Sequence, residues 1–422
     1  MITRALYSAA WAVALPLALL RLAIRSRRQP GYLHAVEERL GRYSTAAEAP
    51  VIWVHAVSVG ETRAAAPVIA SLRRAWPGHR ILLTHMTPTG RETGEALFGD
   101  DIARAWLPYD VGFAVRGFLD HWRPRFGVIL ETEVWPRLLE ECARAGVPVI
   151  LANARLSERS ARRYARWPSL ARWAFGNIAV VAAQAEADAE RFRALGSRRV
   201  AVTGNVKFDI EVPVDAEARG AALRAAWGRD RSVWIAGSTR DGEENLLLDA
   251  FISASPPSGT LLVIVPRHPQ RFDEVAALAA ARGFEVARRS HGGAVPATVR
   301  VVVGDSMGEM PAYYAAGDLV LMGGSFLEFG SQNLIEPCAL GRPVILGPST
   351  FNFAEAARGA VKAGAAIEAS DALDAVRKAR ELAGQPQKRA EMGEAGRRFV
   401  SGHRGAMARL AAAIAAAVDA KA

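Results

Sequence analysis

The sequence predicts an α/β protein with two doubly wound, Rossmann-like domains that face a central cleft, preceded by an N-terminal membrane-anchor helix. Its 422 residues fit two domains of nearly equal size, and half of them are hydrophobic, so each domain can bury a core. Short runs rich in β-branched residues alternate with helical patterns. This alternation restarts after an acidic, proline-bearing segment at residues 209–219, which indicates a second domain.

The first two dozen residues differ in kind from the rest of the chain. The segment from Ala5 to Leu20 carries no charge, and it is followed by Arg21, Arg25, Arg27 and Arg28. The run is short for a full membrane span, but the arginines fit anchorage beside a negatively charged cytoplasmic leaflet. A cleaved signal peptide is the alternative, although no small-residue cleavage site precedes the arginines. We therefore expect an uncleaved anchor at residues 1–28.

Two series of apolar segments predict the strands of two parallel sheets, because fully apolar strands interleaved with helices are typical of sheets covered on both faces. The first series comprises residues 51–56, 81–84, 126–130, 147–152, 178–182 and 200–202. The second comprises residues 233–236, 261–265, 299–303, 319–322 and 344–346. With the linker between them, we expect a first domain at 29–212 and a second at 213–422.

The charge balance favours anionic partners. A formal net charge of +10 suits nucleic acid, anionic lipid or phosphorylated small molecules, but no recognised nucleic-acid motif is present, so we expect no nucleic acid partner. A basic stripe with nearby aromatic residues fits either a solvated helix face or membrane docking. It comprises Arg155, Arg159, Arg162 and Arg166, with Tyr164, Trp167 and Trp173.

The two cysteines do not indicate a disulfide or a metal site. Cys142 and Cys338 lie far apart in helical patterns, and neither has a partner at metal-ligand spacing. We expect two ordinary, partly buried thiols and no bound metal.

Charged residues follow several predicted strands of the first domain. Glu61 opens a helix directly after the first strand, where it is either a catalytic carboxylate or a partner of the helix dipole. Glu131 and Glu133 close another strand and share a face of extended chain. Lys207 follows a third strand, and pairing with Asp209 is its alternative role. In open parallel sheets ligands bind beyond the carboxyl ends of the strands, so these residues are candidates for a site.

The second domain carries features of a phosphate and nucleotide platform. A glycine-bearing loop at residues 323–330 leads into a helix whose first turn suits a phosphate, although the loop matches neither standard nucleotide motif. Glu336 is placed to bond ribose hydroxyls, and Arg267 suits a phosphate or carboxylate. From the residues alone, the segment at 304–310 is an ordinary helix start.

Together these segments closely resemble one family, the 3-deoxy-D-manno-oct-2-ulosonic acid (Kdo) transferases of lipid A assembly, which are of GT-B type. The resemblance covers nearly the whole chain. It rests on ordered matches at residues 55–61, 86–90, 107–110, 131–136, 152–157, 203–209, 265–269, 304–309 and 333–336. One departure is the loop at 328–332, where relatives carry a Gly-Gly-His or Gly-Gly-Gln type sequence.

The resemblance implies an inverting transfer of Kdo from CMP-Kdo to the lipid A precursor, lipid IVA, in lipopolysaccharide biosynthesis, without a required metal or other cofactor. It implies that Glu61 is the general base and that Glu131 and Lys207 stabilise the transition state. The implied CMP site comprises Pro266, Arg267, Met307, Gly308, Glu309, Asn333, Leu334, Ile335 and Glu336. The implied location is the cytoplasmic side of the cell inner membrane, in contact with membrane lipid. A GT-B enzyme that uses another nucleotide sugar, such as a UDP-sugar, is the alternative.

Overall fold

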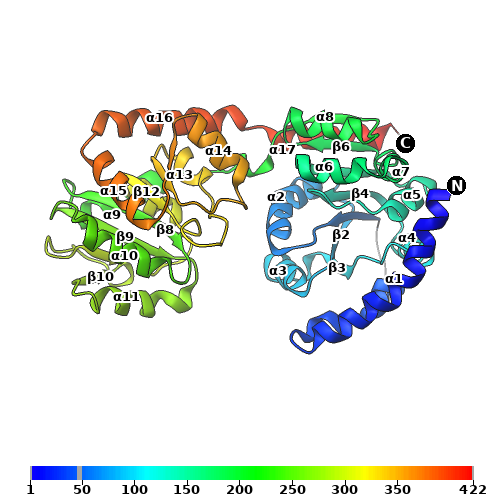
Figure 1. The fold of residues 1–422 in the computed structure, drawn as a ribbon, viewed down its shortest axis with the longest axis horizontal. Helices are drawn as coiled ribbons and strands as arrows, with labels where there is room; N and C mark the ends of the chain where they lie inside the picture. Colours follow the sequence, from blue (N-terminus) through cyan, green and yellow to red (C-terminus); the bar gives the residue numbers. More distant parts are fainter. Residues whose placement is uncertain (1, 45–49, 421–422) are drawn as a thin grey trace. The chain divides into compact units, whose positions relative to one another are not determined.

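The computed structural model describes residues 2–44 and 50–420, and the chain forms two compact units (Figure 1). Unit 1 comprises the residues up to Asp209 together with those from Gly405 onward, and unit 2 comprises Ile210–Arg404. Each unit contains one parallel seven-stranded sheet. The expected α/β class with two parallel sheets is confirmed.

The sheet of unit 1 has the strand order β3-β2-β1-β4-β5-β6-β7. Alternate side chains of β1 enter two different core layers: Trp53 packs on one face, and Ile52 and Val54 pack on the other. Both layers are apolar, which explains why these strands read as continuous hydrophobic runs. The strands are β1 (Val51–His55), β2 (Arg80–His85), β3 (Ala103–Trp106), β4 (Pro124–Leu130), β5 (Val149–Ala154), β6 (Val180–Ala183) and β7 (Val200–Val202).

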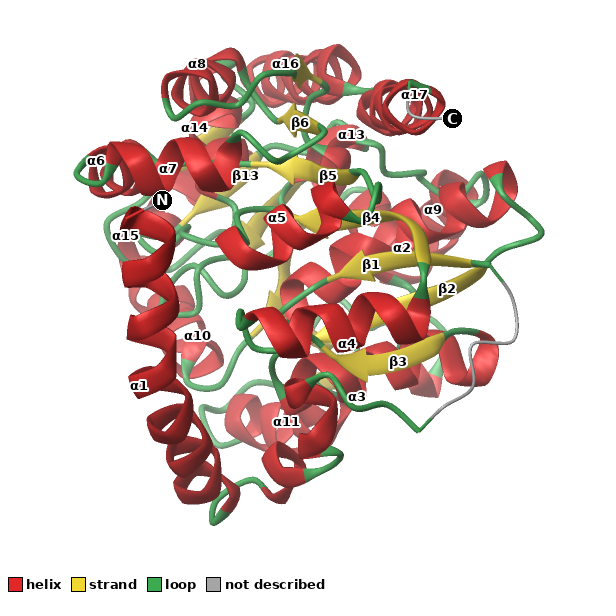
Figure 2. Ribbon diagram, turned by 90° about the vertical axis from the view of Figure 1, so that its right-hand side faces the viewer, coloured by secondary structure: helices red, strands yellow, loops and turns green. Residues whose placement is uncertain are grey.

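Helices cover both faces of this sheet. Side chains of α4, α5 and α7 belong to the layer that contains Trp53, whereas α2 and α17 belong to the opposite layer. Figure 2 shows α4 and α5 in front of the strands of unit 1. The helices are α1 (Ile2–Ser26), α2 (Val59–Ala75), α3 (Pro88–Phe98), α4 (Gly112–Trp122), α5 (Pro136–Arg144), α6 (Glu158–Ala165), α7 (Pro168–Phe175), α8 (Glu186–Ala194) and α17 (Ala406–Asp419).

Unit 2 repeats the architecture with the strand order β10-β11-β9-β8-β12-β13-β14. Its strands are β8 (Ser232–Thr239), β9 (Thr260–Pro266), β10 (Val286–Arg288), β11 (Val301–Val303), β12 (Leu319–Met322), β13 (Val344–Leu346) and β14 (Ala366–Glu368). Its helices are α9 (Ala216–Trp227), α10 (Glu243–Ala254), α11 (Phe272–Ala280), α12 (Met310–Ala316), α13 (Ile335–Ala339), α14 (Ala354–Lys362), α15 (Ala372–Ala383) and α16 (Pro386–His403). Short 3-10 helices are η1 (Pro30–Leu33), η2 (Val36–Leu40), η3 (Gly99–Asp101), η4 (Val206–Phe208), η5 (Pro269–Arg271) and η6 (Arg289–His291).

Three strands were not predicted, and all three lie at sheet edges. β3 ends the sheet of unit 1, and β10 and β14 are the two ends of the sheet of unit 2. Each has only three or four residues, and the residues of β10 are only half-buried. An edge strand pairs on one side only and carries a weaker apolar pattern, so the sequence signal is faint there.

The C-terminal helix corrects the expected domain boundary. Residues 405–422 were assigned to the second domain, but α17 packs on the sheet of unit 1, where Leu410, Ile414 and Val418 are buried. The carboxylate of Asp209 accepts hydrogen bonds from the backbone N–H of Gly405, at 2.6 Å, and of Met407. An alanine-rich amphipathic helix carries no local signal for which sheet it covers, so only tertiary packing decides.

Two further expectations concern the cysteines and the N-terminus. Cys142 and Cys338 form no disulfide, as expected, but both are fully buried rather than partly buried. The stretch Thr3–Ser26 of α1 is long and apolar enough, by length and composition, to cross a membrane. That property makes it a candidate anchor.

The α17 packing predicts that Leu410→Ala destabilises unit 1. Removing this buried side chain leaves a cavity, so the free energy of unfolding of unit 1 should fall by about 2–5 kcal/mol. Differential scanning calorimetry of the full chain checks this, with the exposed position Ala412→Ser as the control on the same helix. A change confined to the unfolding of unit 2 would contradict the assignment of α17.

Candidate active site

Glu61 lies in the first turn of α2, where it takes part in a reciprocal cap. Ser58 is the N-cap residue, and its Oγ accepts a hydrogen bond from the Glu61 backbone N–H at 3.4 Å. In return, the carboxylate accepts from the Val57 N–H at 2.8 Å and from Ser58 Oγ at 3.2 Å. This arrangement follows the Ser-x-x-Glu capping pattern, with the Val57 N–H in place of the Ser58 N–H as the backbone donor, so Glu61 stabilises the helix start.

The environment of Glu61 also changes its acidity. Its pKa is raised to about 7: burial is the main cause, the Val57 N–H and Ser58 oppose the rise, and the carboxylates of Glu131 and Glu133 add to it. A helix-start carboxylate in water would have an ordinary or lowered pKa, so capping alone does not account for this value. A carboxylate that titrates near neutral pH is suited to accept a proton during catalysis.

Glu131 and Lys207 lie at the same edge of the sheet, beyond the carboxyl ends of their strands. Glu131 follows β4 directly and has φ +61°, a conformation unusual for a residue with a side chain. Its N–H donates to the Ala152 carbonyl of β5 at 2.9 Å. Asn153 Oδ1 accepts from the Val206 N–H at 3.2 Å, and this bond ties η4, which carries Lys207, to the end of β5. Strained backbone of this kind is often found at functional sites.

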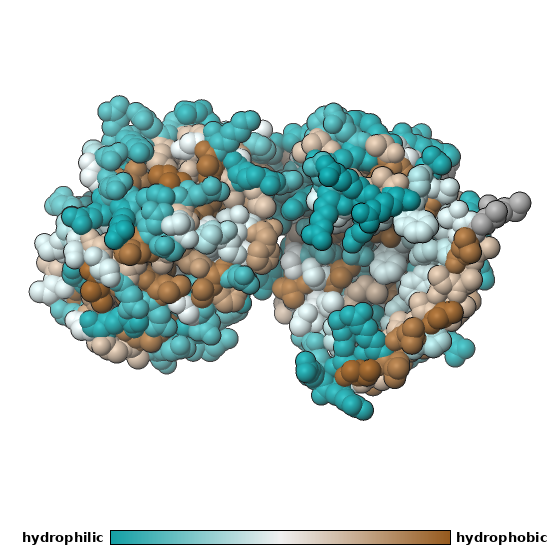
Figure 3. Space-filling model, in the orientation of Figure 1, coloured by the Kyte–Doolittle hydropathy of each residue, from teal (hydrophilic) through white to brown (hydrophobic). Residues whose placement is uncertain are grey.

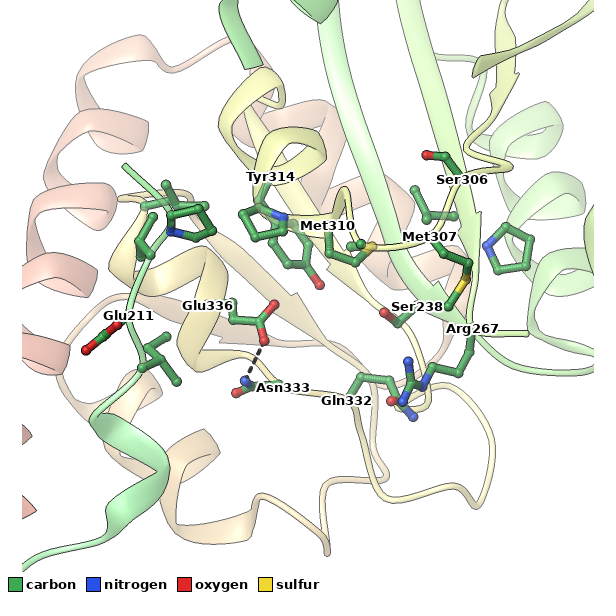
Figure 4. A pocket seen from close by; sticks show the side chains of 18 residues that line it. Glu211, Ser238, Arg267, Ser306, Met307, Met310, Tyr314, Gln332, Asn333 and Glu336 are labelled. Atoms are coloured by element: carbon green, nitrogen blue, oxygen red, sulfur yellow. Dashed lines mark hydrogen bonds between the residues drawn. The ribbon is translucent and has the colours of Figure 1, made fainter. Parts of the chain in front are cut away.

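Unit 2 contains a cavity of about 500 Å³ beyond the carboxyl ends of β8, β9 and β12 (Figure 4). Of the residues predicted for the CMP site, Pro266, Arg267, Met307, Gly308, Asn333 and Glu336 line it. They come from the end of β9, from the turn before α12 and from the start of α13. These segments are far apart in the sequence, and the structure brings them around one cavity.

Asn333, Glu336 and Arg267 give the cavity mixed polarity. Asn333 Nδ2 donates to Glu336 Oε1 at 2.9 Å, the bond drawn in Figure 4. Burial raises the pKa of Glu336, whereas this hydrogen bond and the positive charge of Arg267 oppose the rise. Both side chains suit a nucleotide. The Glu336 carboxylate can accept hydrogen bonds from ribose hydroxyls, and the Arg267 guanidinium can bind phosphate.

Three residues of the predicted CMP site do not line this cavity. The carboxylate of Glu309 binds Arg219 at 2.6 Å and Arg289 at 3.3 Å instead. Leu334 and Ile335 are fully buried. Their side chains therefore belong to an ion-pair cluster and to the apolar core of unit 2.

Other residues of the cavity were not predicted. Ser238, near the end of β8, has φ +56°, and Tyr314 of α12 is almost fully buried, which raises its pKa. Gln332 lines the cavity beside Asn333. In the sequence, Ser238 could have been found from the change from apolar to small residues at Gly237–Thr239, which marks the end of a strand. Tyr314 lies inside an ordinary helix, and no local sequence pattern indicated that it lines a cavity.

Glu243 holds the glycine loop that follows β12. This fully buried carboxylate accepts the N–H of Gly324 at 2.6 Å and of Phe326 at 2.9 Å, and also that of Arg240 at 2.8 Å. A Cβ at Gly323 would lie 2.4 Å from the Ser238 carbonyl oxygen, so the loop approaches β8 too closely for any other residue. The loop is thus fixed by a side chain about 80 positions earlier in the sequence.

The segment that departs from the family pattern, residues 328–332, overlaps the end of the same loop. Gly330 has φ +80° and Ser331 has φ +69°. A serine therefore holds a left-handed conformation at the position next to a glycine in that conformation.

Among the described residues, no group of three or more His, Cys, Asp or Glu side chains is arranged to hold a metal ion.

Comparison with known proteins gives first the class of fold. The crystal structure of UDP-GlcNAc 2-epimerase from Neisseria meningitidis bound to UDP-GlcNAc aligns with 87% of this chain and 99% of that chain, with a TM-score of 0.54 and 16% sequence identity. This similarity, with the two parallel sheets, defines a GT-B-type fold.

Sequence comparison then gives the family. The family described as 3-Deoxy-D-manno-octulosonic-acid transferase (kdotransferase) matches residues 34–210. The 3-deoxy-D-manno-octulosonic acid transferase of Bordetella pertussis is 44% identical, over 96% of this chain and 97% of the relative. That of Haemophilus influenzae is 36% identical over the same shares of the two chains. The chain belongs to the Kdo transferase family of glycosyltransferases.

The contacts of Glu243 predict that Glu243→Gln destabilises unit 2. The amide has nearly the same shape, but its NH₂ group must face one of the backbone N–H donors, which leaves a buried donor without an acceptor. We expect a loss of about 1–3 kcal/mol in the free energy of unfolding of unit 2. Urea denaturation measures it, with the exposed Glu285→Gln as the control. Equal stability of the two variants would contradict the role given to Glu243.

Proposed function

We propose that this protein is an inverting glycosyltransferase that moves Kdo from CMP-Kdo to the lipid A precursor, lipid IVA, in lipopolysaccharide biosynthesis. Membership of the Kdo transferase family over nearly the full chain supports the sugar and the class of reaction. The single observation that carries the mechanism is the carboxylate of Glu61, whose pKa is raised to about 7 at the edge of the parallel sheet.

In this proposal the cavity of unit 2 binds the CMP part of the donor. Arg267 binds the phosphate, and Glu336, oriented by Asn333, accepts hydrogen bonds from the ribose hydroxyls. Met307, Gly308 and Pro266 contribute apolar and backbone surface around the base. Glu309, Leu334 and Ile335 shape the site through the backbone, because their side chains point to other partners.

The proposed reaction begins at the acceptor hydroxyl. Glu61 takes the hydroxyl proton while the oxygen forms a bond to the anomeric carbon of Kdo, and the bond from that carbon to the CMP phosphate breaks. Glu131 and Lys207 stabilise the charges that develop as CMP leaves. Because Lys207 and Arg267 supply positive charge to the anionic reactants, the proposed reaction requires no metal ion or other cofactor.

We also propose that the protein works on the cytoplasmic side of the cell inner membrane, held by α1 as a single anchor. The apolar composition of α1 and the arginines that follow it support this location. A lipid acceptor is reached most readily by an enzyme that lies at the membrane surface, so this location agrees with lipid IVA as the acceptor.

The proposed donor site predicts a preference for CMP over UDP. Isothermal titration of the full-length protein should show CMP binding and far weaker UDP binding. Loss of the charged contact in Arg267→Ala should weaken CMP binding by about 10- to 100-fold. The exposed Arg358→Ala on α14 is the matched control and should bind CMP normally. Tighter binding of UDP would favour a UDP-sugar donor, and unchanged CMP affinity in Arg267→Ala would remove Arg267 from the site.

The proposed base predicts how activity depends on pH. In the wild type, kcat/KM should rise as Glu61 ionises, with an apparent pKa near 7. Glu61→Gln should lower turnover by about 100-fold or more and leave CMP affinity nearly unchanged. Glutamine also fits a capping box, so the helix start should survive.

The same substitution has a defined effect on stability. The folded state raises the pKa of Glu61 above its ordinary value, so its contribution to stability is complete below about pH 4.5 and is lost as the pH rises through about 7. The melting temperature of Glu61→Gln relative to the wild type should therefore increase between pH 5 and pH 8. Near-normal turnover with a lowered melting temperature would limit Glu61 to capping α2.

A further inference from the structure

The N-terminal part of α1 is bound to unit 1 by polar contacts. Arg4 Nη1 lies 3.0 Å from the carboxylate of Glu140, and the hydroxyl of Tyr7 donates to Asp110 Oδ2 at 2.6 Å. Both acidic side chains are buried, and Asp110 also accepts the backbone N–H of Leu138 at the start of α5 at 2.7 Å. These contacts attach the helix to groups that are themselves fixed in the fold.

Further contacts extend the attachment along the helix. Arg137 Nη2 donates to Ser8 Oγ at 2.8 Å, and the ring of Trp11 lies 5.8 Å from that of Tyr109. Leu22, near the other end of α1, is buried. Positions 4, 7, 8, 11 and 22 fall on one face of an α-helix, so α1 lies along unit 1 over most of its length. We call this the docked face.

The opposite side of α1 is apolar and exposed. Its five large side chains have exposed fractions between 56% and 68%. Their spacing of seven, four, three and four residues places them in one row, about half a turn away from the docked face. In Figure 3 brown, hydrophobic residues follow the course of α1 on unit 1. We call this row the apolar stripe, and it comprises Leu6, Val13, Leu17, Leu20 and Ile24.

We propose that α1 does not cross the bilayer but lies in the plane of one leaflet, with the apolar stripe among the lipid chains and the docked face on unit 1. This inference rests on the membrane location proposed above and specifies its geometry. A helix that spans a membrane is surrounded by lipid, so Arg4 would have to leave Glu140 and be carried across the hydrocarbon to the far interface. The contacts of Tyr7 and Ser8 would break as well.

The charges around the stripe fit a lipid surface as its occupant. Arg21, Arg25, Arg27 and Arg28 are all exposed at the C-terminal end of α1 and carry charge complementary to anionic headgroups. An amphipathic helix with one apolar face and arginines at its border is the arrangement that binds in the interface of a membrane. A helix that spans the membrane needs no face that bonds to polar groups of the protein, whereas the docked face of α1 makes such bonds.

Thiol accessibility separates the two orientations, because Cys142 and Cys338 are buried and give little background labelling. Ala5→Cys and Ser26→Cys would each be expressed in the full chain, and sealed inverted inner-membrane vesicles would be treated with a membrane-impermeant maleimide. An in-plane helix leaves both thiols on the cytoplasmic side, so both should be modified. Modification of Ala5→Cys only in right-side-out vesicles would show a spanning helix and overturn the proposal.

A crosslink tests the docked face directly and decides the outcome if the thiol at position 5 is modified from neither side. In the membrane-bound double variant Ser8→Cys/Arg137→Cys, a short bifunctional thiol reagent should join the two positions, and mass spectrometry would detect the linked peptides. A crosslink supports docking in the membrane. Its absence, in vesicles where each single cysteine reacts, would overturn the proposal.

Vesicle flotation tests the membrane location and the in-plane orientation of α1 separately. Wild-type protein should float with vesicles of phosphatidylethanolamine and phosphatidylglycerol, and its failure to do so would overturn the proposed location itself. The stripe variant Val13→Ser/Leu17→Ser/Leu20→Ser should bind at least about 100-fold more weakly. Ala5→Ser/Ala12→Ser/Ala23→Ser, which changes exposed positions about a quarter of a turn away from the middle of the stripe, is the matched control and should bind nearly as the wild type does. Equal binding of the two triple variants would contradict the in-plane orientation.

Discussion

Parallel pairing of the strands is the constraint on which both candidate sites depend. Every strand pairs in parallel with its neighbours within its sheet, so all carboxyl ends of a sheet lie along one edge. Glu131, directly after β4, and Ser238, at a register shift in the pairing of β8 with β9, both have positive φ near this edge. The residues that line the unit 2 cavity come from different strands because the fold brings these ends together.

Two buried carboxylates show how the same kind of contact leads to different roles. Glu243 is fully buried and accepts three backbone N–H groups, so its oxygens are largely used in fixing the loop between β12 and α13. Glu61 is only partly buried, accepts one backbone N–H and one hydroxyl, and lies near two other carboxylates. Each carboxylate oxygen of Glu61 keeps capacity for a further hydrogen bond. The first arrangement is suited to holding structure, and the second leaves a group that can exchange a proton.

The first and last described helices, α1 and α17, pack on unit 1, and each does so through a mixture of apolar and polar contacts. α17 buries Leu410 and Ile414 in the core layer beside α2, and Asp209 accepts the backbone N–H groups at its start. α1 uses Arg4 and Tyr7 to bind acidic groups near α5, which leaves its apolar stripe exposed. Apolar surface of this extent on a helix is costly in water, and a lipid surface removes the cost.

The sequence by itself determined the α/β class, the two-domain organisation and eleven of the fourteen strands within residues 2–44 and 50–420, because buried parallel strands are continuous apolar runs that can be recognised locally. It also pointed to Glu61, Arg267 and Glu336, since each follows a strand or opens a helix. Only the tertiary structure decided that α17 covers the sheet of unit 1, that Glu309 pairs with Arg219 outside the cavity, and that Glu243 supports the glycine loop. The physical reason is distance along the chain. Contacts between residues about 80 to 200 positions apart leave no local pattern, and such contacts make Glu243 structural and fix the start of α17. Burial, which raises the pKa of Glu61, is likewise a property of the folded chain.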